Sequence, residues 1–260
     1  MASNEQLNIM SKKKILVIGD GCIDQYIYGR SDRLCPDAPV PVLIPTKTVE
    51  NGGMAKNVYS NILSLNQHCD ILTNKEKIIK TRYVDEKTNH MFIRVDANEK
   101  EIQRVSSAQL QGLKKYDAIV ISDYNKGFLT PIDIQYICSN YPVVFMDTKK
   151  PLGQWAKKCT YIKINEVEYK NSKNFLKSID SVFDDNLIVT LGNQGCRYKD
   201  KIYPVQSVEV KDMTGAGDTF MAALVVEYLK SNNIPKAIEF ANKCATQVVQ
   251  CKGVVTINDL

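Results

Sequence analysis

The chain has 260 residues, of which 44% are hydrophobic and 24% are charged, and it carries a formal net charge of +5. This length and composition suit one large α/β domain or two small ones, with enough apolar surface for a sizeable core. The mild, interspersed charge argues against a nucleic-acid-binding protein, and no apolar run reaches the roughly 18 residues that span a bilayer.

The N-terminal residues and the cysteines indicate the compartment. Residues 1–11 form a polar tail without the apolar segment of a signal peptide. The eight cysteines are scattered through apolar segments, no C-x-x-C pair occurs, and only His68 and His90 could join a zinc site. We therefore expect buried free thiols, no zinc cluster, and a cytoplasmic protein without nucleic-acid or membrane partners.

Short apolar runs recur along the chain and alternate with helix-compatible segments. The runs predict buried strands at residues 14–19, 117–122, 143–146, 161–164 and 186–190. Helical patterns lie between them, for example at residues 54–65 and 131–140. Alternating strands and helices predict an α/β fold with a mostly parallel central sheet and helices on both faces. Ligands of such sheets bind beyond the carboxyl ends of the strands.

Two segments break this alternation. Residues 38–50 are proline-flanked and extended, and residues 79–97 read as two strands around the turn at 85–89. Together they predict a small antiparallel flap carried on the main sheet. An ordinary extension of the sheet edge is the alternative.

Polar residues and glycines gather where ligands are expected. Asp20 and Asp24 follow the first predicted strand, and their carboxylates could accept hydrogen bonds from sugar hydroxyls or cap a helix. Gly52 and Gly53 precede a predicted helix, where glycine lets backbone N–H groups approach a ligand. Asn57 lies one helical turn further on, on the same side as Gly53.

The most informative stretch is 212–218, which reads Asp-Met-Thr-Gly-Ala-Gly-Asp and precedes a helical pattern at 219–229. Helix N-termini expose unpaired N–H groups and attract anions, and glycines let a phosphate come close. The N–H groups of Gly215, Ala216 and Gly217 would form an anion hole, with Asp218 beside it as a general base. Such an arrangement suits phosphoryl transfer to an alcohol. A plain turn with a first-turn acid is the alternative.

This stretch resembles the D-T-x-G-A-G-D signature of the ribokinase/phosphofructokinase-B family of carbohydrate kinases, with Met213 in place of the usual threonine. The resemblance implies a single ribokinase-like kinase domain over residues 12–260, with the flap as a lid over the sugar and with ATP as co-substrate. It also implies that Gly52, Gly53 and Asn57, which match the family's G-G-x-x-x-N element, bind sugar hydroxyls.

Two further motifs match the same family. Asn165 and Glu168 match its N-x-x-E element, which organises Mg²⁺, often through water; oxygen ligands suit this ion. Thr190, Gly192 and Gly195 match its T-x-G-x-x-G turn, which lines the nucleotide pocket, and Asn242 stands where members place a residue near the adenine. A helix start and a hairpin turn, respectively, are the ordinary readings of these two motifs.

Several segments resemble the heptose-phosphate kinase branch of the family, among them residues 24–29, 36–42 and 122–127. That branch is the kinase half of bifunctional enzymes of ADP-heptose synthesis and phosphorylates the anomeric hydroxyl of heptose 7-phosphate. The resemblance makes four residues candidates for binding the phosphorylated sugar: Arg82, Arg94, Asp123 and Lys126. Taken alone, each basic residue is more often a surface charge or a salt-bridge partner.

Two alternatives to a heptose-phosphate kinase stay open. The chain could phosphorylate another sugar or a small alcohol, or it could be a non-catalytic ligand-binding protein with the kinase fold.

The resemblance has a gap after residue 73. Members usually carry another strand–helix unit there, whereas only residues 74–79 separate that strand from the flap. We expect a narrower sheet, and an exposed apolar patch at that place would favour a homodimer. The cytidylyltransferase half of the bifunctional enzymes is not expected in these residues.

Overall fold

The computed structural model describes residues 13–99, 102–175, 179–251 and 253–257. The tail expected at residues 1–11 lies outside this part of the chain. The main sheet has the strand order β12-β11-β10-β9-β8-β7-β1-β4, and its parallel pairings run from β10 to β4. Its strands are β1 (Lys14–Gly19), β4 (His68–Thr73), β7 (Ala118–Asp123), β8 (Val144–Thr148), β9 (Tyr161–Asn165), β10 (Leu187–Thr190), β11 (Cys196–Tyr198) and β12 (Lys201–Tyr203). The predicted parallel sheet is confirmed, and the antiparallel strands β11 and β12 extend it at one edge.

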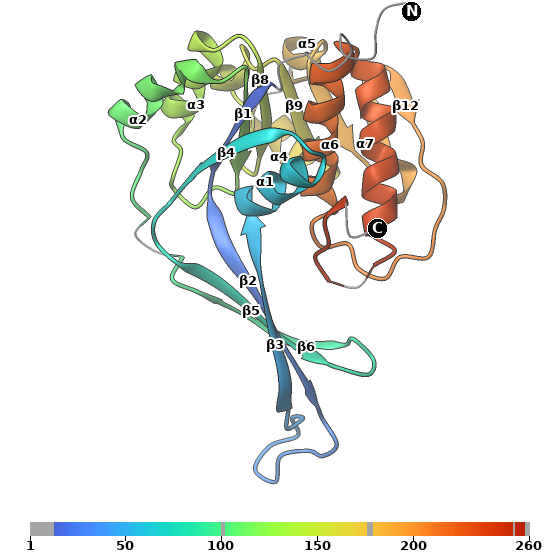
Figure 1. The fold of residues 1–260 in the computed structure, drawn as a ribbon. Coiled ribbons are helices and arrows are strands. Elements are labelled where there is room, and N and C mark those ends of the chain that lie inside the picture. The colour runs from blue at the N-terminus through green and yellow to red at the C-terminus, as the bar shows by residue number, and fades with distance from the viewer. Residues whose placement is uncertain (1–12, 100–101, 176–178, 252, 258–260) are drawn as a thin grey trace, which may run out of the picture.

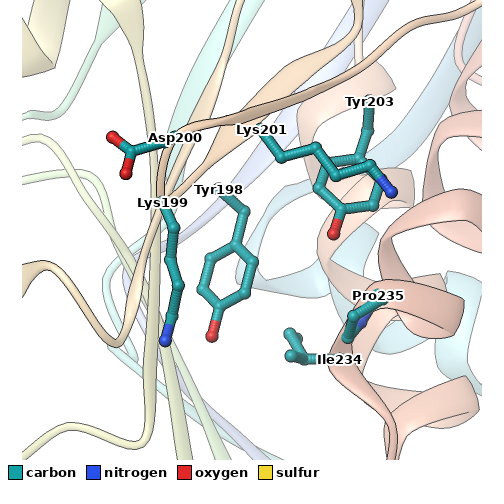
Figure 2. A pocket seen from close by; sticks show the side chains of 7 residues that line it. All are labelled: Tyr198, Lys199, Asp200, Lys201, Tyr203, Ile234 and Pro235. Atoms are coloured by element: carbon teal, nitrogen blue, oxygen red, sulfur yellow. The ribbon is translucent and has the colours of Figure 1, made fainter.

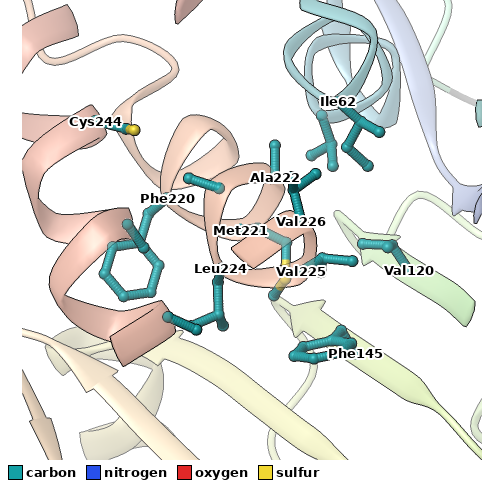
Figure 3. Close-up of a cluster of buried hydrophobic side chains, with 14 of the residues drawn as sticks. Ile62, Val120, Phe145, Phe220, Met221, Ala222, Leu224, Val225, Val226 and Cys244 are labelled. Carbon is teal, nitrogen blue, oxygen red and sulfur yellow. The ribbon is translucent and has the colours of Figure 1, made fainter. Parts of the chain in front are cut away.

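The central strands are buried on both faces, which explains their continuous apolar sequences. In β1, Ile15 and Val17 point into one core and Leu16 and Ile18 into the other, as the two-residue repeat of a strand requires. The first core is formed with α1 (Ala55–Ser64), α6 (Ala216–Ser231) and α7 (Ile234–Val248). Figure 3 shows α6 at its centre, with Met221 and Val225 near Phe145 of β8.

The second core lies on the opposite face of the sheet. It is covered by α2 (Ser107–Gln111), α3 (Pro131–Asn140), α4 (Glu166–Phe175) and α5 (Ile179–Phe183), with the 3₁₀ turns η2 (Gly112–Lys115) and η3 (Gln154–Ala156). Helices on both faces were expected and are confirmed. The predicted helix at 219–229 begins three residues earlier, at Ala216, so Asp218 lies inside its first turn.

The flap is a separate four-stranded sheet, with the order β3-β2-β5-β6. It consists of β2 (Gly21–Arg30), β3 (Ile44–Met54), β5 (Ile78–Asp85) and β6 (Met91–Ala97), which project from the carboxyl ends of the main strands (Figure 1). The antiparallel pairs β2–β3 and β5–β6 agree with the expectation. Strand β2 was not expected, and because it pairs with β5 in parallel, the flap is mixed rather than purely antiparallel.

The chain crosses from the main sheet to the flap at two adjacent points. Asp20 alone separates β1 from β2, and residues 74–77 separate β4 from β5. Asn74 ties the two crossings together, because its side chain accepts a hydrogen bond from the N–H of Gly21 at 2.7 Å and donates one to the carbonyl of Gly21 at 3.1 Å. The short connection after β4 therefore joins the flap directly to the edge of the main sheet.

Strand β4 forms that edge, where an exposed apolar patch would favour a homodimer. Instead, Ile71 and Leu72 of β4 pack against the two cores, and the hydroxyl of Tyr116 donates to the carboxylate of Asp70 at 2.7 Å. The apolar residues Ile71 and Leu72 of β4 therefore belong to the cores, and the homodimer stays a prediction. Several large exposed apolar side chains lie in the flap and its connections instead: Leu34, Val40, Ile44, Met91, Ile93 and Val95.

All eight cysteines are free thiols, as expected, and six of them are buried. None of the helices formed by the described residues has the length and hydropathy of a membrane-spanning segment.

Candidate active site

The first turn of α6 lies at the carboxyl ends of the main strands. Gly215 is its N-cap and adopts a left-handed conformation with φ 83°, which glycine tolerates without strain. A side chain at this position would also collide with Asn57, whose Nδ2 lies 2.7 Å from an ideal Cβ. The N–H of Ala216 donates to the carbonyl of Met213 at 3.3 Å. Within the described residues, the N–H groups of Gly215, Gly217 and Asp218 have no protein acceptor and are the ones left for an anion.

Asp218 is 5% exposed, and both of its carboxylate oxygens accept hydrogen bonds. Asn57 Nδ2 donates to Oδ2 at 2.9 Å, and the hydroxyl of Tyr124 donates to Oδ1 at 2.8 Å. Burial raises the pKa of Asp218 to about 6, although these two hydrogen bonds oppose the shift. A carboxylate with such a pKa is well suited to accept a proton near neutral pH.

Asp218 and the start of α6 open into a cavity of about 720 Å³. The cavity extends over the β10–β11 turn, where Thr190, Gly192 and Gly195 line it, to Asn242 of α7. The turn η4 (Gly192–Gln194) connects the antiparallel strands β10 and β11, so this motif is also the hairpin turn that the sequence analysis gave as the alternative. Asn242 Nδ2 donates to the carbonyl of Tyr203 at 2.9 Å. The residues predicted to bind nucleotide and those predicted to catalyse thus share one cavity.

The floor of this cavity carries a buried ion pair that the sequence analysis did not identify. Lys163 Nζ of β9 lies 2.6 Å from Asp147 Oδ2 of β8, and each side chain is only 4% exposed. An ideal Cβ on Gly217 would lie 2.9 Å from Lys163 Nζ, so this glycine allows the ammonium group to approach the first turn of α6. The sequence signal for this ion pair was a lysine within the apolar strand 161–164, since lysine is rarely fully buried without a partner.

Asn165 and Glu168 form a reciprocal cap at the start of α4. Glu168 N–H donates to Asn165 Oδ1 at 2.9 Å, and Asn165 N–H donates to Glu168 Oε2 at 2.7 Å. Lys149 Nζ also bonds to the Glu168 carboxylate. Nowhere in the described residues do three or more His, Cys, Asp or Glu side chains gather in a way that could hold a metal. The buried Oδ1 of Asp147 has no hydrogen-bond partner there, so it offers one free oxygen near the cavity.

Four residues that were predicted to bind the sugar lie in the flap strands β2, β3 and β5: Asp24, Gly52, Gly53 and Arg82. Asp24 of β2 accepts a hydrogen bond from Arg82 of β5 at 2.5 Å, and the Arg82 guanidinium lies 5.0 Å from the centre of the Tyr26 ring. Gly53 allows β3 to pass close to Asp24, since an ideal Cβ there would lie 2.1 Å from Asp24 Oδ2. Gly52 pairs with Ile23 in the same sheet. Both glycines belong to strand β3 and do not form a loop before α1.

Two predicted acids face the protein interior. Asp20 is 1% exposed and accepts hydrogen bonds from the N–H groups of Tyr124, Lys126 and Phe128, which fixes the loop after β7. Asp123 is equally buried, and its carboxylate accepts from Lys150 Nζ and Thr148 Oγ1, both at 2.5 Å. Neither residue lines the cavity.

The remaining basic candidates are paired. Lys126 Nζ lies 2.6 Å from Glu99 Oε2, and Lys80 Nζ lies 4.0 Å from the other oxygen of the same carboxylate. Arg94 forms a surface ion pair with Asp96 at 2.8 Å. Two lysines therefore share one carboxylate and leave an excess positive charge, whereas Arg94 and Arg82 are balanced one to one.

A second cavity of about 590 Å³ lies away from these residues, between the β11–β12 hairpin and the start of α7. Figure 2 shows that Tyr198 and Lys199 line it from one side and Ile234 and Pro235 from the other. None of the predicted site residues lines it.

Comparison with known proteins places these features in a family. Residues 64–259 match the model of the pfkB family carbohydrate kinases. The chain is 31% identical over 295 residues to the bifunctional protein HldE of Nitratiruptor sp. and 32% identical over 297 residues to HldE of Helicobacter pylori strain J99. These alignments cover 94% and 93% of the chain but only 63% and 64% of the relatives. These alignments are longer than the chain itself, so the relatives contain residues without a counterpart here.

Solved structures show the same fold. Ribokinase from Thermotoga maritima superposes with a TM-score of 0.69 at 17% identity, covering 93% of this chain and 94% of that one. Ribokinase from Arabidopsis thaliana, solved with ribose and ATP, gives a TM-score of 0.69 at 16% identity and covers 96% of both chains. The chain therefore has the ribokinase-like fold and belongs to the pfkB family of carbohydrate kinases.

Proposed function

We propose that this kinase transfers the γ-phosphoryl group of ATP to a hydroxyl of a phosphorylated sugar, and that the acceptor is the anomeric hydroxyl of heptose 7-phosphate. The observation that carries the reaction is the position of Asp218, a buried carboxylate with raised pKa beside unpaired N–H groups at a helix start. The identity of 31–32% with HldE proteins supports the heptose phosphate.

In this proposal, Asp218 accepts the proton of the sugar hydroxyl as the oxygen attacks the γ-phosphorus. The N–H groups of Gly215 and Gly217 stabilise the charge on the phosphoryl oxygens, and Lys163 adds a positive charge beneath them. Asn57 orients Asp218 through its hydrogen bond to Oδ2. The cavity wall at Thr190, Gly192, Gly195 and Asn242 holds the nucleotide.

We further propose Mg²⁺ as the cofactor. The oxygens present fit an ion that keeps most of its waters: Asn165 and Glu168 at the start of α4, and the free Oδ1 of Asp147. When bound, the ion offsets the charge of the triphosphate. The flap would close over the sugar and exclude water, with Asp24, Gly52 and Gly53 contacting the hydroxyls.

The acceptor is tested with purified protein, ATP, Mg²⁺ and a panel of acceptors. The panel contains heptose 7-phosphate, unphosphorylated heptose, fructose and fructose 6-phosphate. ADP release gives the rates, and phosphorus NMR identifies the product. Heptose 7-phosphate should give the highest kcat/KM. A better unphosphorylated acceptor would refute the proposed substrate, and no transfer to any acceptor would favour the non-catalytic alternative.

Lys126 is the basic residue that we propose for the phosphate already on the substrate, because it and Lys80 share only one carboxylate. Lys126→Met should raise KM for the sugar phosphate by about tenfold, since a charge-assisted hydrogen bond contributes about 1.5–3 kcal/mol. KM for an unphosphorylated sugar should stay unchanged. Steady-state kinetics with both acceptors measures this, and Lys199→Met, which removes a lysine paired with Asp185 elsewhere, is the control. Equal effects of Lys126→Met on both acceptors would contradict the assignment.

The pKa of Asp218 sets the pH dependence. Because the base must be ionised and its pKa is raised to about 6, kcat/KM should fall about tenfold per pH unit below 6. The free energy of unfolding changes in the opposite sense, because the fold favours the protonated carboxyl of Asp218. This contribution to stability is complete below the ordinary carboxyl pKa and is lost as the pH rises through 6. A pH–rate profile from pH 4.5 to 8 tests the first statement. An acidic limb near pH 4 would show that burial does not raise the pKa of the catalytic base.

A further inference from the structure

Tyr124 is a residue of the cavity to which the proposed reaction gives no role. It follows β7 directly and lines the cavity together with Asp218. Its hydroxyl donates a hydrogen bond to Asp218 Oδ1 at 2.8 Å. The other oxygen of Asp218 is held by Asn57, which orients the base from the α1 side. The Tyr124 hydroxyl therefore donates to the carboxylate oxygen of Asp218 that receives no hydrogen bond from Asn57.

The phenol makes the contact that an acceptor hydroxyl has to make. A general base accepts a hydrogen bond of about 2.6–3.2 Å from the hydroxyl whose proton it removes. Tyr124 offers the same donor group, an O–H, at such a distance. A buried carboxylate oxygen without a donor is costly, so in the absence of sugar either this phenol or a water must satisfy it. A water in that position would be activated for attack on ATP.

The structure holds Tyr124 in this place from several sides. Its N–H donates to Asp20 Oδ2 at 2.8 Å, so Asp20 anchors the backbone of the loop. Its ring packs against the small apolar cluster of Cys22, Met54 and Ile78 at the base of the flap. Lys149 Nζ lies 5.3 Å from the ring centre on the nucleotide side. Since that cluster belongs to the flap strands and their connection to α1, a movement of the flap would reach the Tyr124 ring.

We propose that Tyr124 is a positioning residue that substitutes for the acceptor hydroxyl on Asp218 when no sugar is bound, and that the sugar displaces it. The phenol then keeps water from the base and suppresses wasteful ATP hydrolysis. Sugar binding removes this block and places the acceptor hydroxyl on Oδ1. This inference rests on the proposed function, because it assumes that Asp218 is the base for a sugar hydroxyl.

The first test compares Tyr124→Phe with the wild-type enzyme. The variant keeps the ring and its packing but loses the hydroxyl. Hydrolysis of ATP without sugar should rise by roughly tenfold or more, a part of the 10²–10⁴-fold that a positioned base contributes. The maximal rate with sugar should stay within about threefold, because the phenol has left Asp218 in that complex.

The second test uses pH profiles, since kcat/KM reports the free enzyme and kcat the sugar complex. Loss of a donor to Asp218 should move the acidic limb of kcat/KM to higher pH and leave the limb of kcat in place. The other charged or titratable groups facing Asp218 are Asp147 of β8, Lys149 after β8, Lys163 of β9 and Cys22 of β2, and all are unchanged in the variant. The shift therefore reports the phenol.

Tyr116→Phe is the matched control, because it removes a tyrosine–aspartate hydrogen bond of 2.7 Å at the distant β4 edge. It should change neither hydrolysis nor the profiles. The inference would be overturned if a folded Tyr124→Phe enzyme hydrolysed ATP at the wild-type rate, or if both pH limbs shifted equally. Phosphate found on Tyr124 by mass spectrometry would overturn it as well. If instead the wild-type protein phosphorylates no sugar, it is the proposed function that fails.

Discussion

Asp218→Asn is expected to lower kcat by about 10²–10⁴-fold, because the variant keeps the shape of the side chain and loses the carboxylate that we propose as the proton acceptor. ATP affinity should change little, since we propose that the cavity wall and the N–H groups of Gly215 and Gly217 hold the nucleotide. The variant should also be at least as stable as the wild type near neutral pH, because it removes a buried charge whose pKa is raised to about 6.

The measurements are single-turnover transfer, nucleotide binding by calorimetry and thermal unfolding. Unimpaired transfer by Asp218→Asn would show that the carboxylate is not the base. Loss of both transfer and nucleotide binding with a lowered Tm would show a structural role instead. We expect the variant to lose phosphoryl transfer while it retains nucleotide binding and its Tm.

Lys163→Met should destabilise the protein by about 3–5 kcal/mol, because it leaves the carboxylate of Asp147 buried without its partner. The double variant Lys163→Met/Asp147→Leu should recover much of this loss, since an apolar pair of similar volume often replaces a buried ion pair at little cost. Urea unfolding of the three proteins measures both effects. Transfer should fall in the single and the double variant, because each lacks the ammonium group beneath the first turn of α6.

Lys170→Met is the control for this prediction. Lys170 and Glu166 form an exposed pair at 2.9 Å on the surface of α4, and its loss should cost at most about 0.5 kcal/mol. If Lys163→Met changes the free energy of unfolding as little as Lys170→Met does, the Asp147–Lys163 pair is not the buried support that the geometry indicates.

The parts of the fold that the sequence predicted are those with a local cause. The strand at Lys14–Gly19 is apolar at every position that the two cores bury, and the helix after residue 215 begins at a glycine pair. Strand β2 was not predicted, because Gly21–Arg30 mixes one acid, two tyrosines and two glycines without a clear alternation. It is a strand because β3 and β5 pair with it on both sides, from positions 14–33 residues and 56 residues away, respectively.

The same division holds for the site. The glycine-rich segment at 215–218 predicted a helix start that exposes N–H groups, and an aspartate at the end of such a turn must lie beside them. The burial, hydrogen bonds and raised pKa of that aspartate, in contrast, follow from the tertiary structure. Asn57 and Tyr124 lie 161 and 94 residues away from it, and Lys163 and Asp147 come from two separate strands. Burial and hydrogen bonding depend on which segments pack together, and the order of strands in the sheet, which no local pattern encodes, brings these side chains to one edge.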